Sequence, residues 1–171
     1  RINRQDGQEN HIELWTEKDA LSAILKRSTE KYHIQLVVNK GYTSSSAIYR
    51  AYKRCVHNIA RGKNVIILYF GDHDPSGLDM VRDIRERLTF MLEKGDENFE
   101  NIGEDDFKVL PIGLTMEQIK KYKLPPNPTK LTDSRANKYI KKFGKTCWEV
   151  DALNPRTLTE IVETNIQKIS S

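Results

Sequence analysis

Residues 65–77 read VIILYFGDHDPSG, an apolar run that leads into a loop with two aspartates between glycines. An apolar run of this length is typical of a strand that is buried on both faces of a parallel sheet. Pro75 cannot donate to a strand ladder, and Gly71 and Gly77 let the backbone turn sharply around the aspartates. The stretch therefore predicts a central strand whose carboxyl end carries a polar loop.

Strands and helices alternate along the rest of the chain, as apolar spacing, capping residues and glycines indicate. This order predicts an α/β fold, with right-handed crossovers and a mainly parallel four-stranded central sheet flanked by helices on both faces. The predicted strands are 11–16, 34–38, 64–70 and 107–112. The predicted helices are 17–31, one from 43–46 to just before Gly62, 78–92, 115–122, 132–142 and 155–169. Prolines make 125–128 an extended loop.

The chain has 171 residues, which fits one domain of ordinary size with its own core. Charged residues make up 30%, but apolar residues recur throughout, and no run reaches the roughly 20 residues of a membrane helix. We expect residues 1–10 to be a flexible start or linker and 11–171 to form one domain with a C-terminal helical extension. The chain starts at Arg1, which favours a fragment of a longer protein. Two cysteines without metal-type spacing favour a reducing, cytoplasmic setting.

Charge is unevenly distributed along the chain. The formal net charge is +4, a mild preference for polyanionic partners. Residues 93–106 hold seven carboxylates and one lysine, whereas 110–145 hold nine Lys or Arg opposed by Glu117 and Asp133. The basic segment predicts either a phosphate-binding surface with salt-sensitive affinity or a solvated lysine-rich helix face.

Three carboxylates follow two of the predicted strands. Glu17 comes directly after the strand at 11–16, and Asp72 and Asp74 come directly after the strand at 64–70. Parallel neighbours place their carboxyl ends, and hence these acids, at one edge of the sheet. A hard divalent cation such as Mg²⁺ takes oxygen ligands of this kind. An isolated Asp-x-Asp pair is also common in surface turns, so both interpretations stay open at this point.

Several motifs occur in an order that resembles a Toprim domain. These are EKDA at 17–20, KGY at 40–42 and DHDPSGLD at 72–79. The version found in the A subunit of topoisomerase VI and in the related meiotic double-strand-break protein is the most similar. The resemblance covers roughly 11–169, because GLT at 113–115, YKLP at 122–125, LTDSR at 131–135 and EVDAL at 149–153 have counterparts too.

The resemblance implies a Rossmann-like Toprim fold and Mg²⁺-dependent cleavage of DNA strands, with Mn²⁺ as a substitute ion. Glu17, Asp72 and Asp74 would be the catalytic and metal-binding acids, and Glu17 would also act as a general acid or base. Asp79 matches a further acid of the family pattern, while its alternative interpretation is an exposed aspartate in the first turn of a helix. DNA would be the partner, and the full-length protein would be a homodimer, associated with the nucleoid in a bacterium or archaeon.

Other residues are candidates for phosphate contacts. Lys18 lies beside Glu17, where a surface ion pair is the alternative, and the turn at 40–42 precedes a capped helix start. His73 lies between the two aspartates and should point away from them. The phosphate-binding candidates are Lys18, Lys40, Gly41, Tyr42, Asp133 and Arg135.

The chain departs from the family in one respect. In the topoisomerase VI type, the tyrosine nucleophile lies in a winged-helix domain before the Toprim domain, and nothing in this sequence resembles that domain. We expect ordinary roles for the tyrosines here, with Tyr139 a partly exposed helix residue, and an isolated chain that is inactive. The alternatives are a nuclease that uses metal-activated water, a non-catalytic DNA-binding or dimerisation module and, more weakly, a primase-like nucleotidyl transferase.

Overall fold

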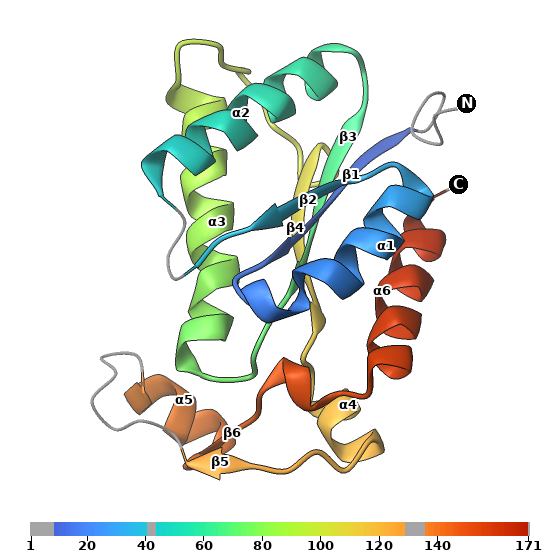
Figure 1. Cartoon of the computed structure of the whole chain (residues 1–171). Coiled ribbons are helices and arrows are strands. Elements are labelled where there is room, and N and C mark those ends of the chain that lie inside the picture. The colour runs from blue at the N-terminus through green and yellow to red at the C-terminus, as the bar shows by residue number, and fades with distance from the viewer. Residues whose placement is uncertain (1–8, 41–43, 129–135, 171) are drawn as a thin grey trace.

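Four parallel strands form the sheet at the centre of the molecule (Figure 1). The computed structural model describes residues 9–40, 44–128 and 136–170. The order across the sheet is β2-β1-β3-β4, as the predicted parallel α/β fold requires. Trp15 lies opposite both Val37 and Tyr69, so β1 ends level with its two neighbours. The strands are β1 (Asn10–Thr16), β2 (Gln35–Val38), β3 (Asn64–Phe70) and β4 (Phe107–Gly113).

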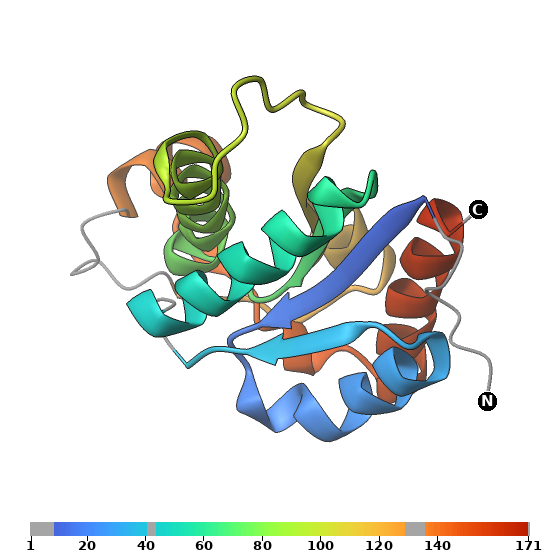
Figure 2. The same cartoon turned by 90° about the horizontal axis from the view of Figure 1, so that it is seen from above.

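Helices cover both faces of the sheet, as Figure 2 shows from above. One face packs against α2 (Ser45–Ala60) and α3 (Pro75–Lys94), and the other against α1 (Ser22–Tyr32) and α6 (Pro155–Ile169). β3 contributes alternate residues to the two cores, with Ile66, Leu68 and Phe70 on the α1 and α6 side and Val65, Ile67 and Tyr69 on the other. The prediction that this strand is buried on both faces is confirmed.

Side-chain caps mark the starts of α2, α3, α4 (Met116–Lys121) and α6. Asp74 caps α3, which begins at Pro75, three residues before the predicted start at 78. The prediction was wrong there because proline fits the first helical turn, where its missing N–H is not needed. Thr115 and Gln118 form a capping box at α4.

Short elements gather below the carboxyl ends of the strands, at the lower end of Figure 1. Here β5 (Asn127–Pro128) pairs antiparallel with β6 (Thr146–Cys147), so the segment predicted as a plain loop contains a short strand. α5 (Ala136–Phe143) lies beside this pair, and the 3-10 turns η1 (Asp19–Leu21) and η2 (Val150–Ala152) complete the chain. Among the described residues, no helix has the length and apolar character needed to cross a membrane.

Candidate active site

The structure brings the three predicted acids together at the carboxyl edge of the sheet. Glu17 follows β1, and Asp72 and Asp74 lie in the loop between β3 and α3. Because β1 and β3 are paired neighbours, all three side chains line one pocket of about 360 Å³. The rest of its lining comes from α3, β5 and the β6 region, namely Pro75, Ser76, Asn127, Pro128, Cys147, Trp148 and Glu149.

Asp72 is the most constrained of these acids. Its side chain is 10% exposed; Oδ1 accepts the backbone N–H of Val150 at 2.8 Å, and Oδ2 lies 3.2 Å from Nζ of Lys18. Burial raises the pKa of Asp72 above its usual value, although these two donors act to lower it, and the neighbouring Asp74 raises it further. The donors present therefore do not fully offset the cost of burying this carboxylate.

Lys18 forms ion pairs with acids at the site, although it is not among the residues that line the pocket. Its ammonium is 3.2 Å from Asp72, 3.5 Å from Asp151 and 3.9 Å from Glu149. Burial acts to lower the pKa of Lys18, but these three carboxylates, Asp72 above all, raise it. Glu149 and Asp151 were not predicted as site residues, although the EVDAL segment at 149–153 contains both of them.

Asp74 has a structural task within the pocket. Its Oδ1 accepts the backbone N–H of Gly77 at 2.6 Å and so caps α3. A Cβ at position 77 would collide with the backbone oxygen of Asp72, which explains why the loop needs glycine there. The cap fixes Asp74 at the pocket and leaves its second oxygen without a hydrogen bond inside the described part of the chain.

The buried hydroxyl of Tyr69 lies near the acids. Tyr69 is 3% exposed, and its hydroxyl has no hydrogen-bond partner within residues 9–40, 44–128 and 136–170. Burial raises the pKa of Tyr69, and the negative charges of Glu17, Asp72 and Asp74 raise it further. Tyr69 is not among the residues that line the acid pocket, so its O–H adds no ligand there.

The remaining predicted residues lie elsewhere. Asp79 accepts from Arg82 at 2.7 and 3.1 Å and is not among the residues that line the pocket, and exposed Lys40 lies 3.6 Å from Asp19. Gly41, Tyr42, Asp133 and Arg135 lie outside the described residues. Within the described residues, no group of three or more His, Cys, Asp or Glu side chains is close enough to hold a metal ion as placed.

His73 turns away from the acids, as predicted, into a wall of aromatic rings. It is 3% exposed, and its ring centroid lies 4.6 to 5.8 Å from those of Tyr139, Phe143 and Trp148. The hydroxyl of Tyr139 is 2.8 Å from the carbonyl of Thr146, to which it can donate, and 2.9 Å from Nδ1 of His73. The Tyr139 hydroxyl has a single proton, which it donates to this carbonyl. The hydrogen bond between the hydroxyl and His73 is therefore donated by Nδ1–H of His73.

This wall fixes the position of the C-terminal part of the chain. The backbones of His73 and Trp148 exchange two hydrogen bonds, of 2.9 and 3.0 Å. Tyr139 is 4% exposed, so the prediction of a partly exposed residue was wrong: its ring is covered by His73 from a loop 66 residues away. The contacts hold α5 and β6 against the pocket.

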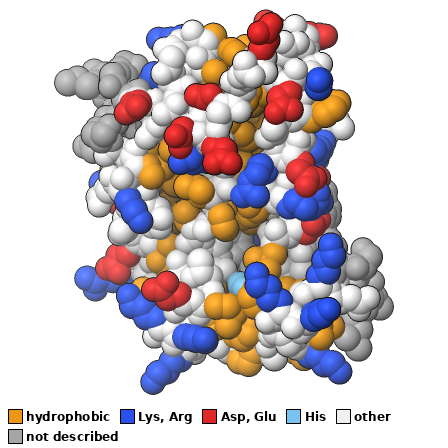
Figure 3. All heavy atoms as spheres, turned by 180° about the vertical axis from the view of Figure 1, so that it is seen from behind, with side chains coloured by type: hydrophobic (Ala, Val, Ile, Leu, Met, Phe, Trp, Pro, Cys, Tyr) orange, Lys and Arg blue, Asp and Glu red, His pale blue; other side chains and the backbone are white. Residues whose placement is uncertain are grey.

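Exposed lysines surround this end of the molecule. The seven basic residues of 110–145 that are described are all exposed and belong to α4, α5 or their flanks. Figure 3 shows basic side chains gathered toward the lower end, while acidic side chains are denser toward the upper end. We call these residues the lysine patch: Lys120, Lys121, Lys123, Lys138, Lys141, Lys142 and Lys145.

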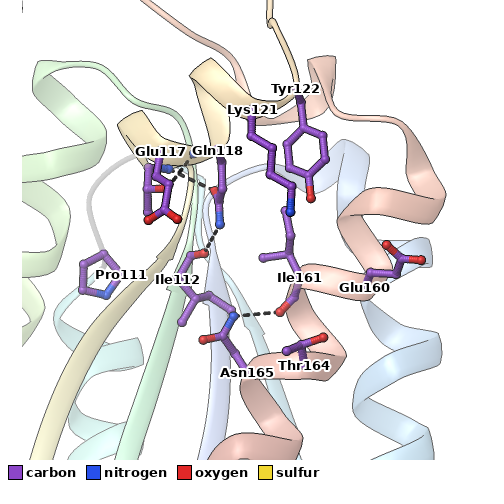
Figure 4. A pocket seen from close by; sticks show the side chains of 11 residues that line it. Pro111, Ile112, Glu117, Gln118, Lys121, Tyr122, Glu160, Ile161, Thr164 and Asn165 are labelled. Carbon is purple, nitrogen blue, oxygen red and sulfur yellow. Dashed lines mark hydrogen bonds between the residues drawn. The ribbon is translucent and has the colours of Figure 1, made fainter.

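A second pocket, of about 450 Å³, lies between the end of β4, α4 and α6 (Figure 4). Some of its polar side chains have structural tasks. Gln118 donates to the carbonyl of Ile112 at 2.9 Å, and Asn165 donates to the carbonyl of Ile161 at 2.8 Å. None of the three predicted acids lines it, so the acid pocket is the better candidate for chemistry.

Comparisons with protein-family models, curated proteins and solved structures gave no match to this chain. The Toprim resemblance, and the activity that it implies, therefore stay predictions.

Proposed function

We propose that this chain is the metal-binding part of an enzyme that cleaves phosphodiester bonds in DNA, of the Toprim type. The observation that supports this most is the meeting of Glu17, Asp72 and Asp74 in one pocket, beside the lysine patch. Carboxylates that follow adjacent parallel strands offer oxygen ligands, and lysines around them attract phosphates.

The chemistry of the donors fits Mg²⁺ or Mn²⁺. All three side chains offer hard carboxylate oxygens. Asp72 and Asp74 each use one oxygen for a backbone N–H, and the second oxygen of Asp72 is paired with Lys18. The ammonium of Lys18 lies 3.2 Å from Asp72, so this carboxylate already interacts with one cation.

A divalent ion bound by these acids would supply the positive charge that neutralises a scissile phosphate. The chain's own residues perform the remaining tasks. Glu17 is the carboxylate that takes up or returns the proton of the attacking hydroxyl or water. Asp74 holds the amino end of α3 at the pocket through its cap, and Lys18 supplies a fixed positive charge beside Asp72.

DNA affinity measured with and without Mg²⁺ tests this proposal. Fluorescence anisotropy with a labelled duplex should show that Mg²⁺ tightens binding by the wild-type chain, because the ion reduces repulsion between the acids and the phosphates. Asp72→Asn should remove this gain and leave the metal-free affinity intact or higher. Equal gains in the wild-type chain and in Asp72→Asn would refute the proposed site.

The lysine patch has its own matched test. Lys141→Ala with Lys142→Ala should weaken duplex binding and reduce the slope of log K against log salt by about 2, because each phosphate contact releases roughly one counterion. Lys26→Ala with Arg27→Ala removes the same charge from α1, away from the patch, and should leave the slope unchanged. A similar slope change in both variants would show a general charge effect and no DNA-facing patch.

A second function is favoured by one observation. Lys18 lies among three carboxylates and, as placed, no group of three metal-binding side chains forms within the described residues. A non-catalytic DNA-binding or dimerisation module, in which Lys18 permanently neutralises the acids, would have this arrangement. DNA binding that is indifferent to divalent ions, together with no heat of Mg²⁺ or Mn²⁺ binding in calorimetry, would favour this function over the first.

A further inference from the structure

A basic pocket lies at the opposite edge of the sheet from the acids. It has a volume of about 560 Å³ and is formed by the amino ends of β1 and β2 and the carboxyl end of α2. β1 spans seven residues, or about 20 Å at the usual rise of a parallel strand, so one ligand group cannot touch both pockets. Figure 1 shows the amino end of β1 at the far end of the sheet from α4 and α5.

The described lining of this pocket holds Lys and Arg side chains but no Asp or Glu. Three histidines, His11, His33 and His57, and the amides of Gln35 and Asn58 add further polar groups. A concave site surrounded by hydrogen-bond donors, with no carboxylate in its wall, favours an anionic ligand. The four cations are Lys53, Arg54, Arg61 and Lys63.

Arg54 is held rigidly below the pocket. Its Nε and Nη2 donate to the carboxylate of Glu13 at 2.8 and 3.0 Å, and Glu13 is 1% exposed. His11 and Trp15 complete the partners of Glu13, at 2.9 and 3.0 Å. Nη1 of Arg54 makes no hydrogen bond within the described residues, so a preorganised donor remains for a ligand.

The exposed rim of the pocket also carries hydrogen-bond donors. Nη1 of Arg61 donates to Nε2 of His57 at 3.0 Å, because a guanidinium can only donate, and this places the proton of neutral His57 on Nδ1. Lys53 lies 2.8 Å from Glu97, so one cation is already neutralised from outside the lining. Arg61, which is exposed, and Lys63, which is half-buried, also line the pocket, so it is bordered by donors besides those of Arg54.

We infer that this pocket binds a chain of phosphate groups, as in a nucleoside triphosphate or inorganic tripolyphosphate. A volume of about 560 Å³ matches small-molecule sites, which are concave and few per protein. Duplex DNA presents a long phosphate backbone, which suits an extended basic surface such as the lysine patch better than a compact pocket. The inference does not rest on the proposed function, because the two pockets share no residue.

Calorimetry of the whole chain in EDTA tests the inference, because EDTA removes any contribution of metal ions at the acid pocket. Sodium tripolyphosphate and ATP should each bind at one site. Arg61→Ala with Lys63→Ala should weaken both by about tenfold or more, since charge-assisted hydrogen bonds are lost. Lys26→Ala with Arg27→Ala removes equal charge from α1 and should change either affinity by less than about twofold.

A second measurement on the unmodified chain covers the case of a variant that does not fold. Adding tripolyphosphate should shift the NMR signals of the Arg54 side chain and the His57 ring and leave those of Asp72 and Lys18 in place. Equal affinity for the two ligands would assign binding to the phosphates alone, and tighter binding of ATP would add a contact with the nucleoside.

Three results would overturn the inference: no binding of either ligand, equal weakening in both double variants, or shifts confined to the lysine patch. The inference would also be overturned if tripolyphosphate and ATP do not bind but the binding of duplex DNA depends on Arg61 and Lys63. That result would assign the pocket to nucleic acid.

Discussion

Glu13 and Asp72 are both buried carboxylates on or beside neighbouring strands, but their surroundings have opposite effects. Burial acts to raise the pKa of Glu13, yet hydrogen bonds and charge from His11 and Arg54 lower it from 4.5 to about 2. At Asp72, burial outweighs the N–H of Val150 and the ammonium of Lys18, so the pKa is raised. Glu13 is thus fully compensated by this chain, and Asp72 is not.

The difference separates a structural acid from a functional one. A buried carboxylate saturated by its own protein has nothing to offer a ligand, whereas an undercompensated one gains from an added cation. The amino edge of the sheet holds the first kind and the carboxyl edge the second. Three predictions on stability, from the largest effect to the smallest, and one on metal affinity test this contrast.

Arg54→Ala should have the largest effect on stability. It leaves Glu13 buried without its main partner, which costs about 3 to 5 kcal/mol of unfolding free energy. Arg82→Ala breaks an exposed pair with Asp79 and should cost far less stability, because solvent screens that pair. Urea unfolding followed by circular dichroism measures both, and similar losses would contradict a special role for the Glu13 pair.

Acid should destabilise the fold through Glu13. Because its pKa in the folded state lies below 4.5, its contribution is complete above pH 4.5 and is lost as the pH falls toward 2. This shift in the pKa of Glu13 corresponds to about 3 kcal/mol of unfolding free energy. Unfolding free energies between pH 6 and 2 should therefore decline less steeply in Glu13→Gln, and equal slopes would show that Glu13 is not the group responsible.

Asp72→Asn should change stability by less than about 1 kcal/mol and in the stabilising direction. Ionised Asp72 has a raised pKa, so its charge costs stability at neutral pH, while asparagine keeps an oxygen for the N–H of Val150. Thermal unfolding at pH 7 measures the effect. A loss as large as that of Glu13→Gln would place Asp72 among the structural acids.

Lys18→Met should tighten Mn²⁺ binding by about tenfold, because it removes a competing ammonium 3.2 Å from Asp72. Lys40→Met, which removes an exposed partner of Asp19, should have no effect. Calorimetric titration with Mn²⁺ measures both variants. Weaker binding in Lys18→Met would mean that the lysine supports the ion site and does not compete with it.

The fold was predictable because apolar runs and the alternation of strands and helices are local features of the sequence. The run at 64–70 gave the central strand with its observed bounds, and alternating strands and helices gave the parallel sheet. The convergence of Glu17, Asp72 and Asp74 followed from strand adjacency alone. The start of α3 was misplaced because Pro75 suits either a loop or a first helical turn.

The parts that were missed depend on contacts between distant segments. Lys18 meets Asp151 across 133 residues, and Tyr139 meets His73 across 66, so no local spacing reveals either contact. The compensation of Glu13 by Arg54 likewise spans 41 residues. Which acid is compensated is therefore a property of the folded chain, and the sequence pattern does not distinguish the two.

The most direct test of the central claim is paramagnetic broadening by Mn²⁺ in the NMR spectrum of the intact chain. The account predicts that substoichiometric Mn²⁺ broadens the backbone signals of Glu17, Asp72 and Asp74 first and leaves those of Glu13 and Arg54 sharp. Asp72→Asn should abolish the effect. Broadening that is absent, or that is spread equally over both edges of the sheet, would contradict a metal site at the undercompensated acid.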